Sequence, residues 1–244
     1  MSGHSKWANI KYKKGMEDKK RAKIFSKFAR LISVAAREKG SDPETNSALR
    51  AAIEKARSFN MPQEGVERAI KRGTGEIEGL KFEPLLLEGF GPDGIALLLE
   101  AVTDNKNRTL AEIRQLLERF GGKLASSGVL WMFERKGVII VNLKSQIRKF
   151  KPEELELILI DAGAEDIKLK GETLEIYIKP ENLEKIKKDL EGKEIKIEEI
   201  SLDFIPKEEI EIKEEDLKEK IKNLFESLDS HDDIQEIYSN IKTI

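Results

Sequence analysis

The sequence predicts an α+β multidomain protein, with an N-terminal three-helix domain followed by two ferredoxin-like or related α/β domains, the middle one discontinuous. Up to about residue 75, apolar residues recur every three or four positions, which is the spacing of helices. From residue 80 onward, short apolar strands alternate with helical segments. The 244 residues are 39% hydrophobic and 37% charged, which is typical of a folded globular chain and leaves room for several domains.

Three helices are expected before residue 76. The first spans residues 17–39, where apolar residues at helical spacing share one face: Ile24, Phe28, Leu31, Ile32 and Ala35. Asp42 as N-cap and Pro43 at the first helical position start the second, which Phe59 closes. The third begins at Pro62 and ends near Gly73, in a Gly-Thr-Gly segment that is typical of an interdomain joint.

The next segment has the element order ββαβ. Strands are expected over residues 84–90 and 95–103, a helix over 109–120 and a strand over 129–135. The apolar run at 95–99 indicates a strand that is covered on both faces, so further elements must pack over this sheet.

Residues 137–206 show the split βαββαβ pattern of a ferredoxin-like domain. Its elements are expected at 138–143, 153–162, near 167, and at 174–178, 181–190 and 195–204. Two further helices, 214–228 and 232–241, have apolar faces that need a partner, and we expect them to return to the 80–136 sheet. The predicted domains are therefore 1–79, 80–136 together with 207–244, and 137–206.

Positive charge is concentrated at the start of the chain. Between Lys6 and Arg30 there are ten Lys or Arg against only Glu17 and Asp18. Residues 1–79 carry a net charge of +8, whereas residues 80–244 carry −10. Such an asymmetric field orients an approaching polyanion before any contact forms. A basic segment with interleaved aromatic residues predicts nucleic acid as the partner.

The expected contact residues lie in the opening segment and on the face of the first helix opposite its apolar stripe, a basic ridge held in water. They are Lys6, Trp7, Lys11, Lys13, Lys14, Lys20, Arg21, Lys23, Lys27 and Arg30. The ridge would contact phosphates, and Trp7 would offer a stacking surface. Two plainer interpretations stay open: the ridge is only a solvated face, and Trp7 is a core anchor. Phosphate contacts do not specify bases, so DNA and ribosomal RNA both satisfy the charge argument.

Composition argues against most enzyme classes. The chain has no Cys and only His4 and His231, so thiol nucleophiles, thiolate metal sites and histidine zinc cages are not expected, and we predict no cofactor or metal. An enzyme acting on a small acidic ligand in an interdomain cleft remains a remote alternative.

No apolar run is long enough to span a bilayer, and the first twenty residues lack the apolar stretch of a signal peptide, so we expect a cytoplasmic protein.

Three short motifs favour structural roles. Gly89-Phe90-Gly91-Pro92-Asp93-Gly94 fits a dinucleotide fingerprint in form, but a strand follows it, so a hairpin turn is predicted. Ser230-His231-Asp232-Asp233 resembles a capping box that opens the last helix rather than a metal site. Asp104, Asn105, Asn107 and Arg108 fit a helix N-terminus better than an active-site loop.

Several motifs resemble those of one bacterial family. The opening Gly3-His4-Ser5-Lys6-Trp7-Ala8-Asn9-Ile10-Lys11 is similar to the signature of the YebC/PmpR family. Later blocks follow in the same order: Asn60-Met61-Pro62, Arg68-Ala69-Ile70, Arg72-Gly73-Thr74-Gly75-Glu76, Thr103-Asp104-Asn105, Asn107-Arg108-Thr109, Phe133 and Lys136-Gly137. Tyr12 and Gly15-Met16 depart from the pattern. The likeness is distinctive to about residue 137 and looser afterwards.

The resemblance implies a three-domain cytosolic protein that is regarded as a probable DNA-binding transcriptional regulator. No catalytic constellation is apparent in the residues, so we expect no enzymatic activity. It also implies kinship with proteins that act on ribosomes, including a mitochondrial translational activator of cytochrome c oxidase. A ribosome-associated translation factor that contacts rRNA or tRNA through the same basic segment is therefore the alternative function.

Overall fold

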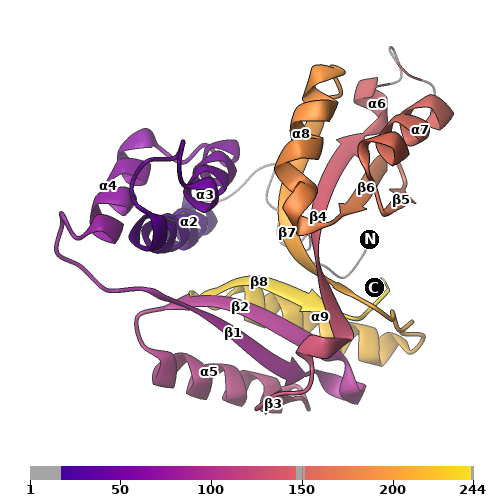
Figure 1. Ribbon diagram of the computed structural model, residues 1–244. Helices are drawn as coiled ribbons and strands as arrows, with labels where there is room; N and C mark the ends of the chain where they lie inside the picture. Colours follow the sequence, from indigo (N-terminus) through magenta and orange to yellow (C-terminus); the bar gives the residue numbers. More distant parts are fainter. Residues whose placement is uncertain (1–17, 147–149, 151, 243–244) are drawn as a thin grey trace.

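The computed structural model describes residues 18–146, 150 and 152–242, and it forms three lobes (Figure 1). A helical lobe, residues 18–76, is followed by two lobes that are each built on a four-stranded sheet. The predicted α+β class, with N-terminal helices before two sheets, is confirmed. No helix in the described part of the chain is long and apolar enough to cross a membrane.

The helical lobe consists of α2 (Asp18–Lys39), α3 (Ser47–Ser58) and α4 (Gln63–Thr74). Helix α3 begins later than predicted because its N-cap is Asn46, not Asp42. The buried Asn46 side chain accepts from Leu49 N at 3.0 Å and donates to Ala35 O and Gly40 O at 2.8 Å. It therefore fixes both the start of α3 and the end of α2.

Helix α4 approaches α2 closely at Gly73. A Cβ at this position would lie 2.3 Å from Ser33 O and 2.9 Å from Ala36 Cβ, so glycine permits the crossing of the two helices. Gly75, with φ of 82°, then ends α4 in the left-handed conformation. The core of the lobe, around Ile32 and Leu49, lies between the three helices.

Helix α2 has a second buried face. Val34 and the partly buried Leu31 pack against Phe82 and Val102, which belong to the first sheet lobe. Residues 32–36 of α2 are consequently buried on consecutive positions rather than at helical intervals. This arrangement places α2 between its own lobe and the first sheet (Figure 1).

The first sheet has the order β3-β1-β2-β8, with antiparallel neighbours throughout. Its strands are β1 (Glu83–Phe90), β2 (Ala96–Thr103), β3 (Lys123–Ala125) and β8 (Ile234–Ser239). Helices α5 (Lys106–Arg119) and α9 (Glu215–Asp229) cover one face through a shared apolar core. The β1–β2 connection is a short 3-10 turn, Pro92–Gly94, so the predicted hairpin is confirmed.

The prediction of a helix over residues 232–241 is wrong, since this segment forms strand β8. Ile234 and Ile237 are three residues apart, as on a helix face, yet they pair with Ala101 and Leu99, which are two apart. A register shift between Glu100 and Ala101 inserts one extra residue in β8 and brings both isoleucines to the core side. A β-bulge thus produced a spacing that imitates a helix.

The second sheet has the order β5-β6-β4-β7 and is also antiparallel. It contains β4 (Phe133–Asn142), β5 (Asp166–Lys170), β6 (Thr173–Ile178) and β7 (Ile197–Pro206). Helices α7 (Pro152–Ala162) and α8 (Leu183–Gly192) pack on one face, and the short α6 (Leu143–Gln146) follows β4. Chain order gives the predicted βαββαβ pattern.

Strand β4 differs from its prediction because it is one continuous strand. The expected strand at 129–135 is instead a 3-10 turn, Leu130–Met132, followed by the start of β4. Strands β4 and β7 stay paired from Phe133↔Pro206 to Val141↔Ile197, and they run from the first sheet lobe up through the second (Figure 1). A paired two-stranded ribbon therefore joins the two sheet lobes.

Candidate nucleic-acid interface

The predicted contact residues fall into two groups. Lys6, Trp7, Lys11, Lys13 and Lys14 lie outside the described residues, as does the side chain of Lys20. Arg21 is exposed at the start of α2. Lys23, Lys27 and Arg30, in contrast, contact the segment between α9 and β8, residues 229–233, which we call the acidic loop.

Lys23 and Lys27 bind the C-terminal end of α9. Lys23 pairs with the Asp232 carboxylate at 3.2 Å and donates to Ser230 O. Lys27 donates to Asp229 O at 2.8 Å and lies 3.6 Å from the Asp229 carboxylate. The last carbonyls of a helix lack internal partners and carry the negative end of its dipole, so two lysines from another lobe stabilise this terminus.

The expectation that the ridge lies in water is wrong for Lys27 and Arg30. Their side chains are only 13% and 15% exposed, because the face of α2 opposite its own core packs on the first sheet lobe. Burial lowers the pKa of Lys27 even though Asp229 and Glu236 oppose that shift. In this arrangement the ridge is an interdomain contact.

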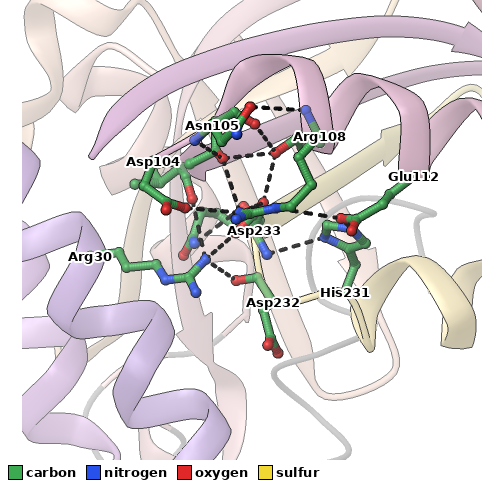
Figure 2. A network of polar contacts seen from close by, with 12 residues as sticks. Arg30, Asp104, Asn105, Arg108, Glu112, His231, Asp232 and Asp233 are labelled. Carbon is green, nitrogen blue, oxygen red and sulfur yellow. Dashed lines mark hydrogen bonds and ion pairs between the residues drawn. The ribbon is translucent and has the colours of Figure 1, made fainter. Parts of the chain in front are cut away.

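Asp233 is the central residue of the contact network (Figure 2). One carboxylate oxygen accepts from Arg30, and the other accepts from Arg108 Nη2 at 2.9 Å and Thr109 Oγ1 at 2.7 Å. Burial by itself would raise the Asp233 pKa, but these hydrogen bonds outweigh burial and lower the pKa to about 2. One buried carboxylate therefore ties α2, α5 and the acidic loop together.

Arg30 makes further contacts around this carboxylate. Its guanidinium donates to Asp232 O at 2.9 Å and lies 5.2 Å from the centre of the Phe82 ring. A planar guanidinium can use its edge for hydrogen bonds while its face rests on an aromatic ring. Arg30 is consequently fixed both by its partners and by its packing.

The segment at the start of α5 has a structural role, as predicted. Asn105 is the N-cap, and its side chain accepts from Arg108 N at 3.1 Å. Asp104 accepts from Arg108 Nη2 at 2.8 Å, and this hydrogen bond lowers its pKa. The capping box proposed for Ser230 and Asp233 is wrong, because Ser230 follows the end of α9 and Asp233 binds arginines.

His231 lies at the edge of the network. Its Nδ1 accepts from Asp233 N at 3.2 Å, so Nε2 carries the proton toward Glu112 at 3.0 Å. Glu112, His231 and Asp233 each offer one ligand atom, all within 4.8 Å of one another. Asp233 already accepts from two arginines, however, and a cation would have to compete with their charge. The donor set fits an ion-pair network better than a metal centre.

A second polar junction connects all three lobes. Lys55 of α3 pairs with Glu236 of β8 at 2.5 Å, and Glu236 lies directly opposite Glu100 across β2 and β8. Burial lowers the Lys55 pKa, but Glu236 outweighs burial and the net pKa is raised. Burial and the nearby Glu236 raise the pKa of Asp203, on β7, to about 7. Like charges are therefore crowded where the lobes meet.

Replacing Asp203 should change the pH dependence of stability. Because the pKa of Asp203 is raised in the folded state, its charged form destabilises the fold above pH 7. As the pH falls from 7 toward the pKa of Asp in the unfolded chain, Asp203 becomes protonated in the folded state and the destabilisation decreases. We expect Asp203→Asn to raise Tm at pH 8 and to change it much less at pH 5. Thermal unfolding monitored by circular dichroism at the two pH values measures the difference, and equal effects at both would contradict the assignment.

Sequence reasoning missed the partners of the ridge. The three ridge cations recur at helical spacing, and Asp229, Asp232 and Asp233 form a comparably dense acidic cluster, so a charge match between them was visible. A helix over residues 232–241 would instead place Asp232 and Asp233 at its N-terminus, where acidic residues are expected without any distant partner.

Comparison with known proteins matches nearly the whole chain. Residues 5–76 match the model of the TACO1/YebC protein N-terminal domain, and residues 82–241 match that of the TACO1/YebC second and third domain. Proteins of Halothermothrix orenii and Thermotoga maritima, both named probable transcriptional regulatory protein, are each 49% identical. These alignments cover 98% and 99% of this chain and 94% of each relative.

A solved structure supports the same relationship. The crystal structure of a conserved hypothetical protein, Aq1575 from Aquifex aeolicus, is 42% identical and superposes with a TM-score of 0.84. The match covers 97% of this chain and 96% of that one. The resemblance carried by the sequence motifs is therefore confirmed, and the chain belongs to the TACO1/YebC family.

Proposed function

We propose that this protein is a cytoplasmic, non-catalytic transcriptional regulator that binds DNA phosphates through its N-terminal segment. The observation that carries the proposal is the charge distribution: ten basic residues lie between Lys6 and Arg30 against two acidic residues, and seven of the ten precede the three that pair with the acidic loop. The remainder of the chain is strongly acidic and repels phosphate. Relatives named as probable transcriptional regulators support the regulatory role.

The three paired ridge residues have a conditional role in this proposal. Lys23, Lys27 and Arg30 are released to bind phosphate when the acidic loop moves away from α2, because their cationic groups otherwise bind this loop. We propose the division 1–79, 80–136 with 207–244, and 137–206 as the units whose relative movement would expose the ridge. The primary contacts are then Lys6, Lys11, Lys13, Lys14, Lys20 and Arg21, with Trp7 as a stacking surface.

Salt titration of DNA binding tests this function. If about five phosphates are neutralised, counterion release gives a log-log slope near −4.5 and a loss of affinity of several hundred-fold between about 50 and 200 mM salt. Reversing Lys11, Lys13 and Lys14 to Glu should abolish most of this binding. Fluorescence anisotropy with a labelled duplex measures both quantities.

A matched charge reversal serves as the control. Lys185, Lys188 and Lys193 are exposed on or beside α8, and their reversal to Glu changes the net charge equally. We expect the control to weaken binding only slightly, and equal losses in both variants would contradict a local contact. A structured ribosomal RNA fragment should be titrated in parallel, because RNA binding without duplex DNA binding would establish the translation-factor alternative instead.

A further inference from the structure

The turn between β3 and β4 exposes two large apolar side chains. Trp131 is 69% exposed and Leu130 is 42% exposed, both in the 3-10 turn Leu130–Met132. Tryptophan in a folded domain normally buries its ring, so an outward indole is unusual. Tryptophan is enriched at interfaces and among the residues that contribute most to binding.

The turn is held in place on both sides. The Glu88 carboxylate accepts from Val129 N at 2.6 Å and Leu130 N at 2.8 Å, and Lys207 N donates to Met132 O at 2.9 Å. Val129, with no exposed surface, is anchored in an apolar cluster. A partner that binds Trp131 would therefore meet a pre-ordered turn and lose little entropy in fixing it.

Cationic side chains surround this apolar cluster. Lys123 Nζ lies 5.7 Å from the centre of the Phe90 ring, and the Arg135 guanidinium lies 5.9 Å from that of Phe204. Phe90 and Phe204 pack on the same cluster as Met132, next to Trp131, and Lys207 is joined to Met132 by its backbone.

The ion-pairing of these three cations is weak, although Arg135 acts on the buried Glu100 and opposes the rise of its pKa. Within the described ranges, no hydrogen bond or ion pair engages the side chains of Lys123, Arg135 or Lys207. Three nearby carboxylates have other partners: Glu88 binds the turn, Glu134 pairs with Lys136 at 2.9 Å, and Glu209 pairs with Lys168 at 3.3 Å. The surface thus combines an exposed indole with cations that no hydrogen bond or ion pair among the described residues engages.

We propose that this surface, Trp131 with Lys123, Arg135 and Lys207, is a second contact site for nucleic acid and that it binds a single-stranded segment. An unpaired base stacks on the indole while neighbouring phosphates meet the cations, the combination that single-strand sites use. A duplex keeps its bases stacked internally and gains nothing from the indole. The inference rests on the proposed function and extends it to a site on the first sheet lobe.

Tryptophan fluorescence provides the test. The chain has two tryptophans, so Trp7→Phe leaves Trp131 as the only reporter in the full-length protein. We expect an oligodeoxythymidine of about 12 nucleotides to quench Trp131 to saturation. Trp131→Ala should weaken binding of this strand about tenfold, since stacking of one base contributes on the order of 1–3 kcal/mol. Trp131→Phe should restore part of the loss.

Controls separate the two sites. Leu130→Ala truncates the neighbouring exposed residue and should leave affinity for the strand nearly unchanged, while Trp131→Ala should not alter duplex binding. If strand binding is intact but Trp131 is not quenched and its replacement by Ala has no effect, the inference is overturned and the proposed function stands. The variant with Lys11, Lys13 and Lys14 reversed to Glu separates the two sites further. If Trp131 is still quenched by the strand in this variant, the Trp131 site is supported. If duplex binding is also unchanged, the N-terminal site is overturned.

Discussion

Replacing Asp233 with Asn should destabilise the protein by about 3 kcal/mol, because it leaves the largely buried Arg30 guanidinium without its carboxylate and removes one carboxylate from the more exposed Arg108. Asn keeps the size of the side chain and can still accept from Thr109, so the loss reports the missing charge. Urea unfolding monitored by circular dichroism at pH 7 measures the difference in the free energy of unfolding.

Asp232→Asn is a matched control for this prediction. The Asp232 carboxylate is 69% exposed, and its pair with Lys23 at 3.2 Å is solvent-screened, so we expect a loss of no more than about 1 kcal/mol. The Asp233 effect should also depend on pH. Since the folded-state pKa is lowered to about 2, its stabilisation is fully present above about pH 4 and disappears as the pH falls through 2. Equal stability of the two variants would contradict the role of Asp233 as the central residue.

Neutralising the acidic loop should strengthen nucleic-acid binding. In Asp229→Asn/Asp232→Asn, Lys23 and Lys27 lose their carboxylate partners and keep only the carbonyl oxygens of Ser230 and Asp229. Movement of the acidic loop away from α2 then costs less free energy and releases both lysines to phosphate. Two added phosphate contacts would steepen the salt slope by up to about 1.8 and raise affinity roughly tenfold near 100 mM salt. Anisotropy titrations of wild type and variant on the same duplex, over a series of salt concentrations, measure both changes.

Two further variants identify the cause. Asp216→Asn/Glu219→Gln removes the same charge from exposed positions near the other end of α9 and should raise affinity only slightly. Adding Lys23→Gln and Lys27→Gln to the neutralised loop should abolish the gain. A gain that persists after both lysines are removed would show that general charge, rather than release of the ridge, is responsible.

Sequence periodicity predicted the elements whose environment is local. The helices of the first lobe and the βαββαβ lobe follow from residues that pack within their own unit, so the spacing of apolar residues reports their structure directly. The hairpin at Pro92–Gly94 and the Asn105 cap were likewise predictable, because turn and cap chemistry depend on a few adjacent residues.

The errors arose where a distant segment decides the structure. Strand β8 exists because β2 supplies its hydrogen-bond partner, and its bulge gives Ile234 and Ile237 a helical spacing. The ridge of α2 had the correct face and charge, but its surroundings depend on where the acidic loop returns some 200 residues later in the chain. An amphipathic pattern identifies the polar face of a helix without specifying whether solvent or another lobe covers it.

The central claim is that the ridge of α2 serves as an interdomain contact while the residues before it bind phosphate. Salt slopes of DNA binding for two double variants, Lys11→Gln/Lys13→Gln and Lys23→Gln/Lys27→Gln, test it most directly. We expect the first pair to reduce the slope by about 0.9 per residue and the second to leave it unchanged. A slope that falls in the second pair and is unchanged in the first would contradict the account.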